Sequence, residues 1–213
     1  MIPATEALER LREGNRRFVA DERRSETIEN RAHRRDLANG QAPFAVILGC
    51  SDSRVPVEIV FDQGLGDLFV IRVAGNIVAP SQIGSVEFAA EQFGTRLVVV
   101  LGHTRCGAIE ATLDALRQPG TTRSRNLQSI VGRIGPAIES LLEAGPHDPE
   151  TLAREAMHAN IRASVDHLRH GSPMIEDLVR SGGLLVVGAA YSLETGQVDF
   201  PDAENAAWTG GRA

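Results

Sequence analysis

Two short stretches of the sequence contain side chains that bind transition metals. The first is Cys50-Ser51-Asp52-Ser53-Arg54 and the second is His103-Thr104-Arg105-Cys106, and each holds one of the chain's two cysteines. Thiolate, imidazole and carboxylate are the ligands that zinc prefers, in four-coordinate tetrahedral geometry. The two stretches together therefore predict a zinc site, and with it an enzyme.

Two buried strands are expected to position these stretches. Apolar runs, Phe44 to Gly49 and Leu97 to Gly102, end directly before Cys50 and His103. Unbroken apolar runs are typical of parallel strands that are covered on both faces. Because α/β proteins bind ligands beyond the carboxyl ends of their strands, we expect the metal-binding side chains of both stretches to meet at that edge of the sheet. Each cysteine would also lie near a helix N-terminus, whose positive dipole end favours thiolate over thiol.

The rest of the chain alternates strand-like and helix-like segments. This pattern predicts an α/β fold with a mainly parallel central sheet of four strands plus a C-terminal edge strand, flanked by helices. We expect a single domain over 1–213, with an N-terminal helical arm over 1–40 and a polar tail over 201–213 that is partly disordered. The first of the helices is expected to be amphipathic and to contain Gly14, with a narrow apolar stripe that is interrupted once. Ser81 is expected to serve as an N-cap. The expected strands are Phe44–Gly49, Leu68–Val73, Leu97–Leu101, Leu184–Ala190 and Gln197–Phe200, and the expected helices are Ala4–Ala20, Val55–Phe61, Ser81–Phe93, Gly107–Arg117, Leu127–Ala144, Pro149–His170 and Ser172–Arg180.

Composition excludes several classes of function. A formal net charge of −6 argues against general nucleic-acid binding, which needs a basic face. No stretch approaches the roughly 20 apolar residues that span a bilayer, and Met1 to Asp21 lacks the apolar core of a secretory signal. We therefore expect a cytoplasmic protein without a nucleic-acid or membrane partner. A disulfide between Cys50 and Cys106 remains the alternative in an oxidising compartment.

The two stretches also resemble the motifs of a known family, the β-class carbonic anhydrases. The motifs stand here as Cys50-Ser51-Asp52-Ser53-Arg54 and Gly102-His103-Thr104-Arg105-Cys106-Gly107. The similarity extends from Gly14–Phe18 through Gly64–Arg72 to Gly188 and Tyr191, and so covers most of the chain.

The resemblance implies a role for each residue of the motifs. Cys50, His103 and Cys106 resemble the family's zinc ligands, and Asp52 and Arg54 resemble its switching dyad. If Asp52 pairs with Arg54, zinc keeps an open position for water, and hydroxide formed there attacks CO2 to give bicarbonate and a proton. If Asp52 ligates zinc instead, the fourth position is filled and no nucleophile forms.

The resemblance also implies a substrate pocket and an oligomer. Gln41 matches a glutamine that hydrogen-bonds substrate or product, and Phe69 matches an aromatic pocket wall. Phe88 stands where many relatives have tyrosine, so any role of that hydroxyl is absent here. Such pockets are completed across a dimer interface in the family, which implies a homodimer or homotetramer.

A regulatory bicarbonate pocket of some bacterial members, built from Trp, Arg and Tyr, is doubtful in this chain. The matching positions are Ile47, Arg72 and Tyr191, so the tryptophan is missing.

Two other functions remain open at the level of the sequence. The same zinc site could hydrolyse carbonyl sulfide or carbon disulfide, as related proteins do. A zinc-bearing fold could also serve as a binding or sensing module without catalysis, although Asp52 and Arg54 are both present.

Overall fold

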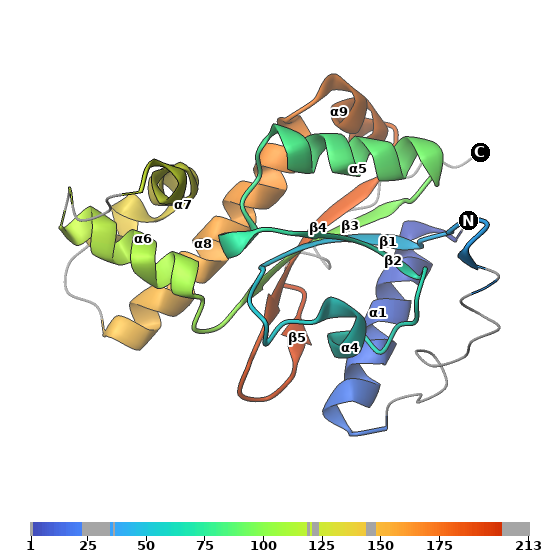
Figure 1. Cartoon of the computed structure of the whole chain (residues 1–213), viewed down its shortest axis with the longest axis horizontal. Coiled ribbons are helices and arrows are strands. Elements are labelled where there is room, and N and C mark those ends of the chain that lie inside the picture. The colour runs from blue at the N-terminus through green and yellow to red at the C-terminus, as the bar shows by residue number, and fades with distance from the viewer. Residues whose placement is uncertain are drawn as a thin grey trace.

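A five-stranded sheet forms the centre of the protein (Figure 1). The structure is a computed structural model and describes residues 2–22, 35, 37–118, 120, 124–143 and 148–201. The strand order is β2-β1-β3-β4-β5, in which β1 to β4 are parallel and β5 pairs antiparallel with β4. The predicted α/β fold, with four parallel strands and a C-terminal edge strand, is confirmed. The strands are β1 (Ala45–Gly49), β2 (Leu68–Arg72), β3 (Leu97–His103), β4 (Leu185–Tyr191) and β5 (Val198–Asp199).

The apolar runs form strands because helices cover both faces of the inner sheet. Every residue of β1 and β3 is buried, whereas the edge strand β2 ends in the exposed Arg72. Successive side chains point to opposite faces. Ile47 and Val99 face one layer of helices, and Leu48 and Val100 face the other. The first layer holds α1 (Ala4–Val19) and α4 (Val57–Val60), and the second holds α5 (Pro80–Gln92), α8 (Pro149–His170) and α9 (Pro173–Arg180).

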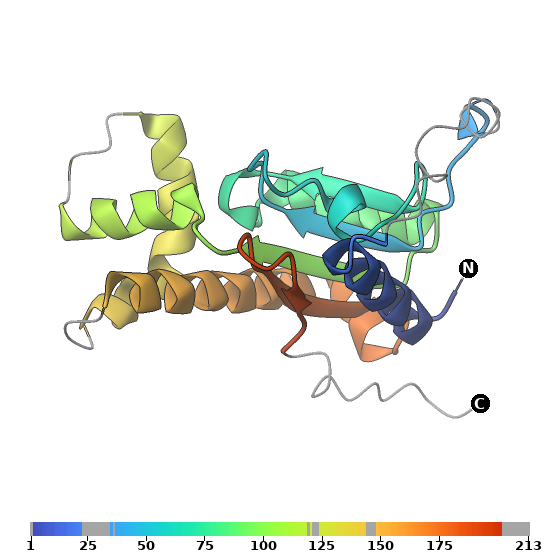
Figure 2. The same ribbon diagram turned by 90° about the horizontal axis from the view of Figure 1, so that it is seen from below.

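A third group of helices lies beyond the carboxyl ends of the strands (Figure 2). Helices α6 (Gly107–Arg117) and α7 (Arg125–Glu143) pack there with the first half of α8. Their apolar side chains form one cluster that also contains Cys50 and Cys106. The two cysteines therefore lie where the sheet meets this helical layer.

Gly14 lies inside α1, on the buried face that also holds Leu8 and Leu11. A Cβ atom on Gly14 would lie 1.8 Å from the carbonyl oxygen of Phe61, so glycine is what allows α1 to approach the chain after α4. The adjacent Asn15 is buried and connects α1 to the hairpin between β4 and β5. Its amide donates to the Gly196 carbonyl at 2.9 Å and its oxygen accepts from the Val198 N–H at 2.9 Å.

Two predicted helix starts differ from the structure. Helix α5 begins at Pro80 with Ala79 as its N-cap, so the prediction of Ser81 as the N-cap is wrong. Proline suits the first helical position because its missing N–H would have no intrahelical partner there. Helix α7 begins at Arg125, before the predicted Leu127.

Parts of the predicted arm and tail, residues 23–34 and 202–213, lie outside the described residues. Within the described residues, no helix combines the length and the apolar character needed to cross a membrane.

Candidate metal centre

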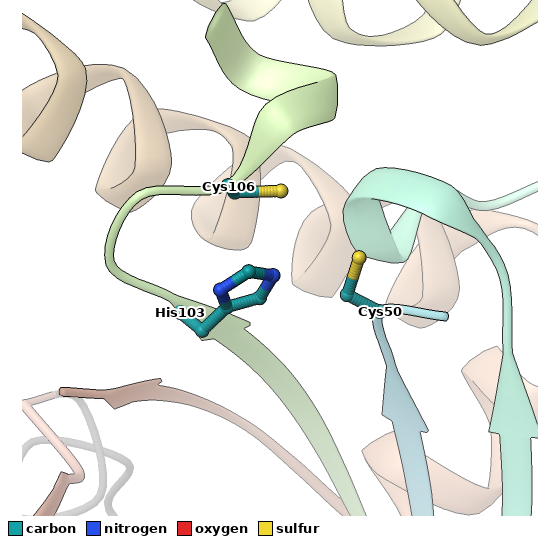
Figure 3. Close-up of side chains that lie close together, drawn as sticks. All are labelled: Cys50, His103 and Cys106. Atoms are coloured by element: carbon teal, nitrogen blue, oxygen red, sulfur yellow. The ribbon is translucent and has the colours of Figure 1, made fainter. Parts of the chain in front are cut away.

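The structure brings Cys50, His103 and Cys106 together at the carboxyl end of the sheet (Figure 3). One ligand atom from each residue lies within 4.8 Å of the other two, and all three residues are buried. Cys50 follows the last residue of β1, His103 is the last residue of β3, and Cys106 is the N-cap of α6. Since β1 and β3 are adjacent parallel strands, their ends present the three side chains to one point.

The histidine is oriented as a metal ligand. Its Nδ1 lies 2.9 Å from the backbone oxygen of Thr104, so Nδ1 carries the proton and donates it to that carbonyl. The other nitrogen, Nε2, then offers its lone pair, and this atom is buried without a hydrogen-bond partner. A buried polar atom without a partner is costly, and a bound cation would remove that cost.

The two thiols lie close enough to shift each other's pKa. A hydrogen bond from Cys106 is the main cause that lowers the pKa of Cys50 to about 4, helped by His103 and opposed by burial. The same bond, together with burial, raises the pKa of Cys106 well above its usual range. Two thiolates this close repel each other, so the second proton leaves only when a cation takes its place.

These residues fit zinc. Two sulfurs at about 2.3 Å from a tetrahedral ion lie roughly 3.8 Å apart, which the spacing of this cluster allows. Both cysteines are free thiols, so the disulfide alternative is not what the structure shows. Three protein ligands leave one position open, as in catalytic zinc sites.

Asp52 and Arg54 form an ion pair beside the cluster. The Arg54 guanidinium donates from Nε and Nη2 to the two carboxylate oxygens at 2.9 and 2.7 Å, and the Arg54 backbone N–H donates to the same carboxylate at 2.9 Å. These bonds from Arg54 hold the pKa of Asp52 well below its usual range. Asp52 Oδ2 also lies 3.9 Å from His103 Nε2, so the carboxylate borders the place where a metal would sit.

Arg72 holds the loop that carries Cys50 and Asp52. It ends β2 opposite Gly49 and donates to the backbone oxygens of Cys50 at 2.9 Å and Asp52 at 2.5 Å. The sequence contained a signal for this role, because a polar residue at the end of a strand next to the cysteine loop can reach its carbonyls. Of the other positions compared with the regulatory pocket, Ile47 and Tyr191 are buried in the core on α1's side of the sheet.

The second loop is held by the β4–β5 hairpin, which sequence reasoning did not connect to the site. The Thr104 N–H donates to the Tyr191 carbonyl at 2.9 Å, and the Thr104 hydroxyl donates to Glu194 at 2.9 Å. Glu194 also pairs with Arg105 at 2.7 Å. The Arg105 carbonyl in turn accepts from Arg54 at 3.1 Å, so the hairpin contributes indirectly to the position of the dyad.

The proposed pocket residues lie far from the metal cluster of the same chain. Phe69 pairs with Val46, near the start of β1, and so lies about 10 Å along the sheet from Arg72, which adjoins the cluster. Phe88 contacts Phe69 with ring centroids 6.2 Å apart and is half exposed. Gln41 precedes β1 at the opposite end of the sheet from Cys50 and is exposed. A single chain does not bring these three residues to the cluster.

Comparisons with known proteins agree with this geometry. Residues 45–198 match the family model described as carbonic anhydrase. The curated carbonic anhydrase 2 of Mycobacterium tuberculosis is 40% identical over 192 residues, which cover 90% of each chain. The carbonic anhydrase of Mycolicibacterium smegmatis is 41% identical over 192 residues and 89% of each chain.

Solved structures give the same result for the fold. A β-carbonic anhydrase of Sordaria macrospora, described as tetrameric, has a TM-score of 0.71 at 24% identity and covers 80% of this chain and 86% of its own. The β-carbonic anhydrase CcaA has a TM-score of 0.67 at 26% identity and covers 91% of this chain and 84% of its own. The chain therefore belongs to the β class of the carbonic anhydrase family, and it is an enzyme of that class.

Proposed function

We propose that this enzyme hydrates CO2 reversibly at a zinc ion held by Cys50, His103 and Cys106. The observation that carries the proposal is the buried cluster of two sulfurs and an unpartnered imidazole nitrogen, bordered by the Asp52–Arg54 pair. When bound, zinc lowers the pKa of a coordinated water from 15.7 toward about 7 and so supplies the nucleophile at physiological pH.

The residues around the cluster have separate tasks in this reaction. Arg54 occupies both oxygens of the Asp52 carboxylate and keeps it away from the open coordination position. Asp52, held in this way, accepts a hydrogen bond from the attacking water and orients its lone pair toward the carbon of CO2. Since the pKa of Asp52 is lowered, the carboxylate remains an acceptor throughout the physiological pH range.

The function and its pH dependence can be tested in one assay. Zinc-loaded protein is expected to hydrate CO2, with activity that rises between about pH 6.5 and 9, because two thiolates donate more charge than neutral ligands and keep the pKa of the coordinated water higher. The increase of activity with pH follows from deprotonation of the coordinated water alone, since the lowered pKa of Asp52 keeps this carboxylate ionised over the whole range. Stopped-flow measurements on CO2, carbonyl sulfide and carbon disulfide would check this. A rate that does not change with pH would contradict the titration of the coordinated water as the cause of the pH dependence. Turnover of carbonyl sulfide or carbon disulfide without turnover of CO2 would contradict CO2 as the substrate.

We also propose that the active unit is at least a homodimer. The support is the distance between the metal cluster and the pocket residues Gln41, Phe69 and Phe88 within one chain. A second copy can place its own Phe69 and Phe88 near the cluster of the first, and the relative from Sordaria macrospora is described as tetrameric. Sedimentation equilibrium is expected to give a mass of at least twice the 22.9 kDa of one chain. A fully active monomer would contradict this arrangement.

A further inference from the structure

A short 3-10 turn, η1 (Ala74–Asn76), lies next to Cys50 (Figure 3). The Gly75 N–H donates to Cys50 Sγ at 3.3 Å, in a buried environment. An N–H that points at a thiolate withdraws charge from the sulfur. The position of this one peptide group therefore affects how strongly Cys50 donates to a bound metal.

The turn has a backbone conformation that needs support from its surroundings. Gly75 has a φ of 71° and Asn76 a φ of 44°, both in the left-handed region. Glycine adopts this region at little cost, but for asparagine it is a minority conformation. A Cβ atom on Gly75 would lie 2.7 Å from the Ile134 side chain, so the turn is also packed tightly against α7.

Two buried side chains of α8 supply that support. The Asn160 amide donates to the Gly75 carbonyl at 2.8 Å, and the Ser164 hydroxyl donates to the Asn76 carbonyl at 3.1 Å. The two residues lie one helical turn apart on α8, and their exposed fractions are only 2% and 5%. The path from α8 to the metal ligand thus has two steps, from Asn160 to the Gly75 peptide and from Gly75 to Cys50 Sγ.

We propose that Asn160, assisted by Ser164, is a positioning residue that fixes the N–H···S bond on Cys50 and so limits the charge that this thiolate donates to the metal. The inference rests on the zinc site proposed above. It assigns a role in metal binding to Asn160 and Ser164, although they are separated in the sequence from the residues that they contact, Gly75 and Asn76, by 85 and 88 positions. Removing the Asn160 amide releases the turn, lengthens the N–H···S bond and makes Cys50 both a richer donor and a less fixed one.

The test uses the full chain loaded with Co²⁺, whose thiolate-to-metal charge-transfer band reports the charge on sulfur. In Asn160→Ala this band is expected to move to longer wavelength, and zinc affinity measured by chelator competition is expected to fall roughly 10- to 100-fold. Ser164→Ala should move the band in the same direction by less, and Ser164→Thr, which keeps the hydroxyl, should restore it.

A matched control separates positioning from ordinary stability. Thr95 is a similarly buried polar residue whose hydroxyl donates to the Pro43 carbonyl at 2.9 Å, at the end of the sheet away from the metal cluster. Thr95→Ala is expected to lower the urea midpoint of unfolding as Asn160→Ala does, but to leave the charge-transfer band and the zinc affinity unchanged.

Each result decides the proposal. An Asn160→Ala protein with an unchanged band and zinc affinity would show a merely structural role and overturn it. If Asn160→Ala does not fold, the Ser164 pair decides, because a band that is the same in Ser164→Ala and the original chain overturns the proposal. A missing thiolate band in the original Co²⁺-loaded chain would instead overturn the metal site itself, which distinguishes the two failures.

Discussion

The His103→Ala variant is expected to lose stoichiometric zinc and to lose CO2 hydration by about 10³-fold or more, since the stabilisation of several kcal/mol that the metal supplies disappears at about 1.4 kcal/mol per tenfold in rate. In the proposed zinc site His103 is the neutral ligand, and its Nε2 is buried without a hydrogen-bond partner. Without it, only the two sulfurs of the cluster remain, and two protein ligands are too few for a tetrahedral zinc site.

The measurement is metal content of freshly purified protein alongside stopped-flow hydration. The original chain is expected to carry about one zinc, and Cys50→Ser is expected to lose it as His103→Ala does. His170→Ala is the matched control, because His170 is an exposed histidine of α8 that pairs with Asp166. An equal loss of zinc and hydration in His170→Ala, or full zinc content in His103→Ala, would contradict the assignment of His103 as a zinc ligand.

The convergence of Cys50, His103 and Cys106 was predictable because it depends on two features that the sequence displays directly. Apolar runs without alternation indicate parallel strands, and the residue after such a run lies at the carboxyl end of the sheet. Cys50 and His103 occupy those positions, and the adjacency of β1 and β3 in the sheet completes the cluster. Cys106 follows because it caps the helix that begins just after β3.

The supporting contacts were not predictable for a physical reason. Asn160 and Ser164 lie on a helix whose position is set by packing against β3 and β4, so nothing local links them to Gly75 and Asn76. The hydrogen bond between Thr104 and Glu194 likewise depends on how the β4–β5 hairpin packs against the loop after β3. Side-chain contacts with backbone at long sequence separation leave no periodic pattern to detect.

Gln41, Phe69 and Phe88 illustrate a different limit. The sequence resemblance places them in a pocket, whereas the chain places Phe69 and Phe88 together on the β2 and α5 side of the sheet, away from its own cluster. Both statements hold if the pocket forms between two copies. A site formed between two subunits is incomplete in the structure of one chain. The sequence alone does not indicate which residues would contribute to a site on a second copy.

Arg54→Ala is expected to abolish most hydration, by roughly 10²-fold or more, while zinc remains bound. Arg54 occupies both oxygens of Asp52, and Asp52 Oδ2 already lies 3.9 Å from His103 Nε2. Once the guanidinium is gone, the carboxylate is free to turn to the metal and fill the position that water needs. Arg54→Lys should recover only part of the activity, since an ammonium cannot pair with both oxygens.

The double variant Asp52→Asn, Arg54→Ala tests whether Asp52 turns to the metal once Arg54 is removed. A neutral amide is a poorer metal ligand than a carboxylate, so the double variant is expected to be at least as active as Arg54→Ala, although it has lost the acceptor that orients water. Hydration rates of the original chain, the two single variants and the double variant form the cycle. Arg180→Ala is the control, because Arg180 forms a similar pair with Asp177 on the exposed surface of α9. Losses that simply multiply in the double variant would show that Asp52 never reaches the metal, and that Arg54 acts by some means other than restraining it.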